Sequence, residues 1–100
     1  MNSADASKVV LVSFVPYSAH HEALLLSLIE RKINLFCAAG KDCENWELAL
    51  DLLLTDPDRN FNHDITTTSH PGEAVEDVLN LAELWHVQGS QAVELIDVST

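Results

Sequence analysis

Apolar residues follow two different periods along this chain, and the two periods alternate. Continuous apolar runs at 8–15 (KVVLVSFV), 33–39 (INLFCAA) and 92–98 (AVELIDV) predict strands. The first run is rich in valine and is typical of a strand that is buried on both faces of a sheet. A shorter and more polar run, DITTT at 64–68, predicts a weaker strand between the last two.

The segments between these runs repeat apolar residues at helical spacing, which predicts helices over 18–33, 42–54 and 71–85. In the second helix, Leu48 and Leu52 widen the apolar stripe that faces the core. The buried stripe of the third helix comprises Val75, Val78, Leu79, Ala82 and Trp85.

Strands that alternate with helices predict an α/β fold, because each parallel strand pair needs a crossover connection. We expect a small three-layer βαβαβαβ domain over residues 8–100, with residues 1–7 disordered. The expected sheet has four mostly parallel strands in the order 2-1-3-4, half of a Rossmann-like or flavodoxin-like fold. In that order the first helix alone covers one face, so its broad apolar surface predicts either a homodimer through helix 19–33 or another partner.

Ligands of such sheets bind beyond the carboxyl ends of the strands, where the strand order reverses. In the order 2-1-3-4 this crevice lies between strands one and three. The loops PYSAHH and TTTSHPGE border it, and a third loop, AAGKDC, lies beside them. Cys37 and His70 are the catalytic candidates there. The candidate ligand-binding residues are Tyr17, Ser18, His20, Lys41, Asp42, Thr68, Ser69 and His70.

The stretch TTTSHPGE at 66–73 also has a purely structural interpretation. Threonines suit a strand, and Pro71 suits the first position of a helix that Ser69 or His70 caps. Glu73 then reaches back to the cap. Capping explains nearly every residue of the stretch except His70, and it is the interpretation that the sequence favours.

Acidic residues dominate the second part of the chain. The formal net charge is −11, and residues 42–100 hold 13 acidic residues against one basic residue, Arg59. Residues 1–41 hold three acidic and four basic residues. Nucleic acids and anionic membranes are bound through Lys and Arg, so the charge argues against both as partners. It suits a basic protein partner, or simple solubility.

Motifs for common catalytic and cofactor sites are missing. Neither glycine-rich phosphate-binding motif occurs. AAGKDC at 38–43 has one glycine and one lysine, but Asp42 and Glu44 follow them and would repel a phosphate. Neither C-x-x-C nor H-E-x-x-H occurs, and no G-x-S-x-G elbow surrounds a serine. We therefore expect no cofactor and no metal, and the balance leans against an enzyme.

Cys37 lies near the end of the predicted strand at 33–39 and shortly before a helix, a position that lowers the pKa of a thiol. FCAAGKDC at 36–43 resembles the phosphocysteine loop of the phosphotransferase-system IIB domains, but in that family the loop follows the first strand and is rich in hydroxyl groups. Its spacing also resembles the cysteine phosphatases, although Cys43 stands where their arginine belongs. A buried structural Cys37 is the favoured interpretation.

Two cysteines make no disulfide framework, the start of the chain is polar, and no apolar run approaches the roughly 18 residues of a membrane span. These features predict a cytoplasmic protein without a membrane segment.

LFCAAGKDCENWE at 35–47, followed by TTTSHPGEAVEDV, resembles a family of small bacterial α/β domains of unknown function. The resemblance spans nearly the whole chain. It implies a bacterial cytoplasmic protein of this fold class and implies no reaction. The residues that carry it are Phe36, Cys37, Gly40, Lys41, Asp42, Trp46, Thr67, Ser69, His70 and Glu73.

Two functions remain open from the sequence. The first is a non-enzymatic interaction or regulatory module that binds a basic protein. The second is a small-ligand or catalytic site at the strand ends that uses Cys37, Lys41, Asp42, Ser69 and His70.

Overall fold

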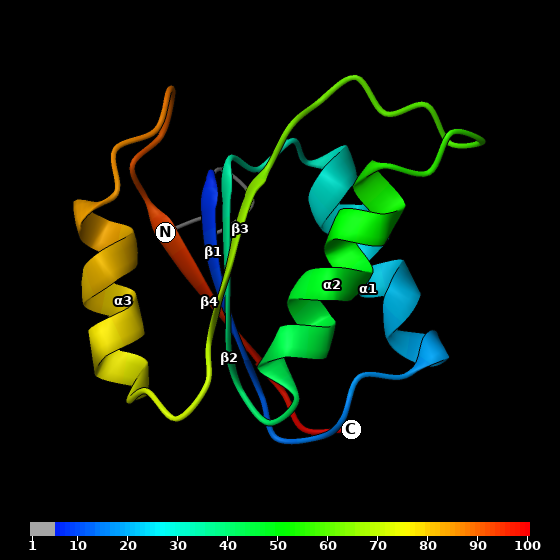
Figure 1. The fold of residues 1–100 in the computed structure, drawn as a ribbon. Coiled ribbons are helices and arrows are strands. Elements are labelled where there is room, and N and C mark those ends of the chain that lie inside the picture. Colours follow the sequence, from blue (N-terminus) through cyan, green and yellow to red (C-terminus); the bar gives the residue numbers. More distant parts are fainter. Residues whose placement is uncertain (1–5) are drawn as a thin grey trace.

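The computed structural model describes residues 6–100, which alternate strands and helices as the sequence predicts. A short 3-10 turn precedes the first helix, and the other seven elements are regular strands and α-helices (Figure 1). Their bounds are β1 Lys8–Ser13, η2 Ala19–His21, α1 Glu22–Glu30, β2 Leu35–Gly40, α2 Cys43–Leu54, β3 Thr66–His70, α3 Val75–Leu84 and β4 Val93–Val98.

The four strands form one parallel sheet, which confirms the α/β class, but their order is β3-β2-β1-β4. The predicted order 2-1-3-4 is therefore wrong. That order would place β3 at the centre of the sheet, where both faces are covered. β3 reads TTTSH and is exposed or half-buried along most of its length, so it lies at an edge.

The helices cover the two faces unequally. α1 and α2 lie on one face and α3 lies alone on the other (Figure 1). Alternate residues of β1 point to the two sides, with Val9 and Leu11 toward α1 and α2 and Val10 and Val12 toward α3. The expectation that the first helix alone covers a face is thus wrong, because β2 and β3 lie on the same side of β1 and bring α2 beside α1.

The turn after β3 also differs from the prediction. Ser69 and His70 are the last residues of the strand, and α3 begins at Val75 with Ala74 at its N-cap. Pro71 is therefore not the first helical residue. Gly72 takes a positive φ of 73° in the connecting turn, so the chain changes direction before the helix starts.

Trp85 follows the last residue of α3 and is 37% exposed, so its predicted burial is wrong. Trp46 is fully buried between α2 and the sheet, as its stripe predicts.

The predicted disorder of residues 1–7 falls mainly on residues 1–5, which lie outside the described residues. Ala6 is buried, and the carbonyl oxygen of Ser7 accepts backbone hydrogen bonds from Asn34 and Leu35 at 2.7 and 3.2 Å.

Lys8 fastens α3 to the sheet. Its side chain is fully buried, and its Nζ donates hydrogen bonds to the carbonyl oxygens of Trp85 at 2.9 Å and Glu83 at 3.4 Å. The carbonyl groups at a helix C-terminus lack partners within the helix and carry partial negative charge. The ammonium group of Lys8 gives these carbonyl groups a hydrogen-bond donor, and their partial negative charge stabilises its positive charge.

Gly40 of β2 lies close against the backbone of Ser13 on β1. Its φ is +83°, and a Cβ atom there would overlap the carbonyl oxygen of Ser13, its register partner on β1. Gly72 has a similar φ of +73°, but nothing lies within 4 Å of the place a Cβ atom would occupy. A substitution at Gly72 therefore introduces backbone strain alone, whereas one at Gly40 introduces backbone strain and steric overlap.

We expect Gly40→Ala to lower the free energy of unfolding by about 3 kcal/mol or more, because strain and a backbone clash add. Gly72→Ala, the matched control, loses only about 1 kcal/mol from the left-handed backbone. Urea unfolding of both variants measures the difference. Equal losses would show that the β1–β2 contact tolerates a methyl group.

Candidate functional site

The sheet divides the predicted site residues between its two faces. On β3, the side chains of Thr68 and His70 share the face covered by α3, because they pair with Cys37 and Ala39 of β2. Ser69 lies between them and points to the opposite face. Since β2 separates β1 from β3, the predicted crevice between strands one and three is not formed.

A chain of polar side chains runs along the α3 face. The Thr68 hydroxyl lies 2.8 Å from Nε2 of His70 and also forms a hydrogen bond with the thiol of Cys37. Nδ1 of His70 lies 3.0 Å from a carboxylate oxygen of Glu73. His70 is buried and Cys37 is fully buried, whereas Thr68 is half-buried and the side chain of Glu73 is 50% exposed.

The chemistry of this polar chain is limited by burial. Burial raises the pKa of the Cys37 thiol, while the Thr68 hydrogen bond and the positive charge of Lys8 lower it by less. The thiol therefore stays protonated at neutral pH, although a hydroxyl group links it to an imidazole. The Thr68 hydroxyl has one proton, so it donates either to the sulfur of Cys37 or to Nε2 of His70 and accepts from the other group.

The opposite face holds a second group around Asp42. Its Oδ2 accepts a hydrogen bond from the backbone amide of Tyr17 at 2.8 Å, and its Oδ1 accepts one from the side-chain amide of Asn45 at 2.7 Å. Asp42 thereby ties the loop after β1 to the start of α2, in a left-handed conformation with a φ of 61°. It is the N-cap of α2 by position, although its side chain makes no capping hydrogen bond.

A surface hollow of about 230 Å³ opens beside this carboxylate. Burial, and to a smaller extent the negative charge of Glu22, raises the pKa of the Tyr17 hydroxyl at its edge. The lining residues are Tyr17, Asp42, Asn45, Leu48, Ala49 and Leu52.

Leu48 and Leu52 are site residues that the sequence pattern misassigns. They widen the stripe of α2 in sequence, but in the structure they are 53% and 61% exposed. Helical spacing alone cannot tell the edge of a buried stripe from an uncovered apolar face. The sequence signal of an exposed apolar face is the i, i+4 spacing of these two leucines beside acidic residues.

Two histidines follow the loop after β1. The hydroxyl of Ser18 lies 2.7 Å from Nδ1 of His20, and the Nε2 atoms of His20 and His21 lie 3.3 and 2.9 Å from the backbone oxygen of Thr100. The His21 ring also packs against Trp46, with 4.6 Å between ring centroids. These contacts join the end of β4 to the start of α1.

Lys41 and Ser69 belong to neither group. Lys41 is exposed, and its backbone amide donates to the carbonyl oxygen of Ser13 at 2.7 Å. Ser69 is half-buried on the face away from His70. Of the predicted site residues, Cys37, Thr68 and His70 are in contact on one face of the sheet. Tyr17 contacts Asp42, and Ser18 contacts His20, on the other side.

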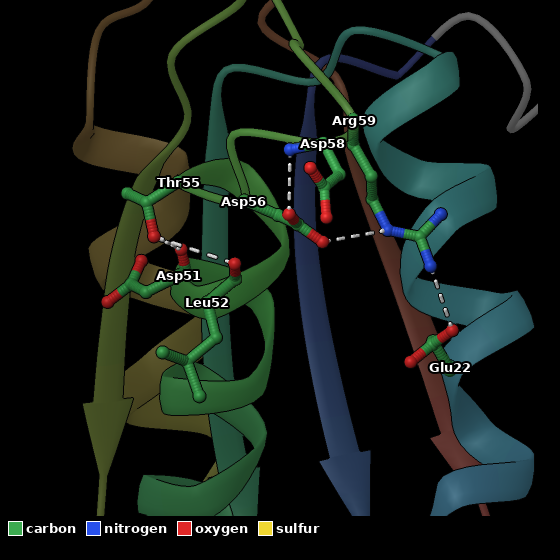
Figure 2. A network of polar contacts seen from close by, with 7 residues as sticks. All are labelled: Glu22, Asp51, Leu52, Thr55, Asp56, Asp58 and Arg59. Carbon is green, nitrogen blue, oxygen red and sulfur yellow. Dashed lines mark hydrogen bonds and ion pairs between the residues drawn. The ribbon is translucent and has the colours of Figure 1, made fainter.

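Basic side chains are largely engaged by the protein itself. Lys8 is buried against α3, and Nη2 of Arg31 lies 2.8 Å from a carboxylate oxygen of Glu94. Figure 2 shows Arg59 between two acidic partners, at 3.5 Å from Asp56 and 3.3 Å from Glu22.

The loop that carries Arg59 borders a larger hollow of about 570 Å³ against α1. The Oδ1 atom of Asp56 accepts a hydrogen bond from the backbone amide of Asp58 at 2.9 Å, which shapes the loop (Figure 2). Arg59 lines the hollow, and its charge is already matched by the acidic partners that hold it.

Within residues 6–100, no three His, Cys, Asp or Glu side chains gather in a way that would hold a metal ion. The same residues include no helix of the length and apolar character that a membrane crossing requires.

Comparison with known proteins yields one match. A family model described as "Domain of unknown function (DUF7684)" matches residues 4–99. No curated protein and no solved structure matches the chain. The match covers both polar groups and both faces of the sheet.

The pKa of Cys37 predicts how stability depends on pH. Burial raises the pKa of Cys37 in the folded protein above the ordinary value of 9.0. The contribution of the protonated thiol to the free energy of unfolding is therefore fully present below about pH 9, and it is lost as the pH rises through the pKa of the folded protein. We expect wild type to lose stability relative to Cys37→Ala as the pH rises above about 9, at up to about 1.4 kcal/mol per pH unit.

Urea unfolding of both proteins across this range measures the effect. Tyr17 titrates in both proteins, so its contribution cancels in the difference. A difference between the two proteins that stays constant with pH would contradict the raised pKa.

Proposed function

Since this chain belongs to the DUF7684 family of domains of unknown function, as its resemblance to such a family led us to expect, we propose its function from its own charges and contacts. The proposal is a non-enzymatic interaction or regulatory module that binds a basic protein. The observation that carries it is the imbalance between exposed acidic groups and internally engaged basic groups.

Acidic side chains occupy both helical layers and the loops of the exposed surface. Among residues 6–100, three basic side chains are exposed, and one of them, Arg59, is paired with two acidic groups. Nine acidic side chains of the same residues are exposed: Glu30, Glu44, Asp58, Asp64, Glu73, Glu76, Asp77, Glu83 and Asp97.

This charge distribution favours a basic partner for a physical reason. Like charges on a small domain repel one another, and a surface of opposite charge relieves that repulsion and steers association. The same acidic groups repel nucleic acids and anionic membranes. Internal pairing of Arg31 and Arg59 leaves the acidic excess unbalanced at the surface.

The proposed compartment is the bacterial cytoplasm. Cys37 and Cys43 are free and buried, which suits a reducing environment. The bacterial origin follows from the family resemblance of the sequence. A partner in this compartment would meet the domain at moderate ionic strength, where charge steering acts within about 8 Å.

Capture from native lysate at low salt, followed by titration of the purified partner, tests this function. We expect one basic protein whose affinity falls about tenfold or more between about 50 and about 500 mM salt. A matched bait with Glu76→Gln, Asp77→Asn and Glu83→Gln has a smaller charge and is expected to show a weaker salt dependence. Affinity that does not change with salt would refute the proposal.

A second candidate function is a catalytic or small-ligand site at the strand ends, with His70 and Cys37 as its reactive groups. The observation that favours it is the polar chain on the α3 face, where Thr68 links the two. Such an arrangement can pass a proton from a thiol to an imidazole. The burial of Cys37 weighs against it, since a substrate must reach the sulfur.

Alkylation by iodoacetamide separates the two candidates. In a Cys43→Ala background, we expect native Cys37 to react no faster than the protein unfolds, because the thiol is buried and protonated. Reaction much faster than unfolding, slowed about tenfold or more by His70→Asn, would instead support the catalytic candidate.

A further inference from the structure

The outer surface of α2 carries an uncovered apolar strip. Leu48 and Leu52 are four residues apart, so they lie side by side on the helix, and both are more than half exposed. Ala49 is half-buried next to them, toward α1. No buried residue of α2 belongs to this strip, because Trp46, Leu50 and Leu53 point to the sheet.

The hollow of about 230 Å³ continues this strip toward the N-terminus of α2. Leu48, Leu52 and Ala49 supply its apolar wall, and Asp42 supplies a carboxylate at one end. Each Asp42 oxygen accepts one hydrogen bond within the protein, and a carboxylate oxygen accepts about two. The hollow thus combines an apolar wall with remaining capacity for a cationic donor.

Acidic groups also flank the other side of the strip. Glu44 lies one turn before Leu48 and is exposed. Glu47 and Asp51 lie toward β3, where their carboxylates accept hydrogen bonds from the Thr67 hydroxyl at 3.2 and 2.8 Å. The strip is therefore bordered by negative charge along its length.

We propose that this strip, defined by Tyr17, Asp42, Asn45, Leu48, Ala49 and Leu52, is the docking surface for an amphipathic basic helix of a protein partner. The helix places apolar residues at i, i+3 or i+4 spacing on Leu48 and Leu52. A Lys or Arg of the helix lays its methylene groups along the hollow and its charged end on Asp42. This inference rests on the proposed function and names the partner's recognition element.

Charge complementarity selects this occupant over a second copy of the chain. Two copies would bring the same acidic border against itself, and each copy has a net charge of −11. A basic helix instead neutralises Glu44 and Asp42 as it covers the leucines. The apolar contact then supplies affinity that salt does not screen.

Titration of the isotope-labelled protein with two synthetic peptides, followed by NMR, tests the docking surface. The probe is a peptide of about 14 residues built from Leu and Lys with leucines at helical spacing. Its control has the same composition in a scrambled order that lacks this period. We expect the probe to shift the backbone NMR signals of the strip and to bind at least about tenfold more tightly than the scrambled peptide.

Three variants locate the contact. Leu48→Ser/Leu52→Ser is expected to weaken probe binding about tenfold or more. The control is Leu84→Ser, at the last residue of α3, where the leucine is 84% exposed, and it is expected to leave probe binding unchanged. Asp42→Asn is expected to weaken binding, and asparagine tolerates the left-handed backbone at this position. Circular dichroism confirms that each variant is folded.

Each outcome has a distinct meaning. Equal binding of both peptides, with shifts spread over the acidic surface, would overturn the docking surface and leave the acidic module intact. No binding of either peptide at low salt would overturn both proposals. Self-association of the free chain that Leu48→Ser/Leu52→Ser abolishes would assign the strip to a second copy and overturn the proposed occupant.

Discussion

The contact of the buried Lys8 ammonium with the end of α3 is the constraint on which the rest of this fold depends. α3 is the single helix on its face of the sheet, and it contacts mainly the two central strands. An unpaired ammonium group inside a protein would cost several kcal/mol, so Lys8 is tolerable only where carbonyl groups meet it. Its position on β1 therefore fixes where α3 ends, and with it where β4 can begin.

The polar character of β3 has consequences for any chemistry in this protein. An edge strand keeps its Thr and Ser side chains partly hydrated, and it places alternate side chains on opposite faces. Thr68 and His70 thus join Cys37 beneath the α3 layer, while Thr67 joins the acidic side of α2. Neighbouring residues of the stretch 66–70 are therefore separated by the thickness of the sheet.

Electrostatics and apolar exposure point to the same helix from different directions. The internal use of Lys8, Arg31 and Arg59 leaves an acidic surface, and α2 adds two exposed leucines to it. A charged surface alone attracts many partners weakly, whereas an apolar strip within it offers a defined contact. This combination of charge and apolar exposure is the basis of the proposed recognition of a partner.

The amino-acid sequence by itself determined the alternation of strands and helices, the α/β class, the buried Trp46 and Cys37, and the acidic excess, because periodicity and composition are local properties of the chain. Only the tertiary structure decided the strand order, the helix that stands alone on a face, the start of α3 at Val75 and the exposure of Leu48, Leu52 and Trp85. It also decided which candidate site residues meet. Apolar spacing shows that a side chain can be buried, but burial itself depends on whether another element covers it, and that neighbour is chosen by the packing of the whole chain.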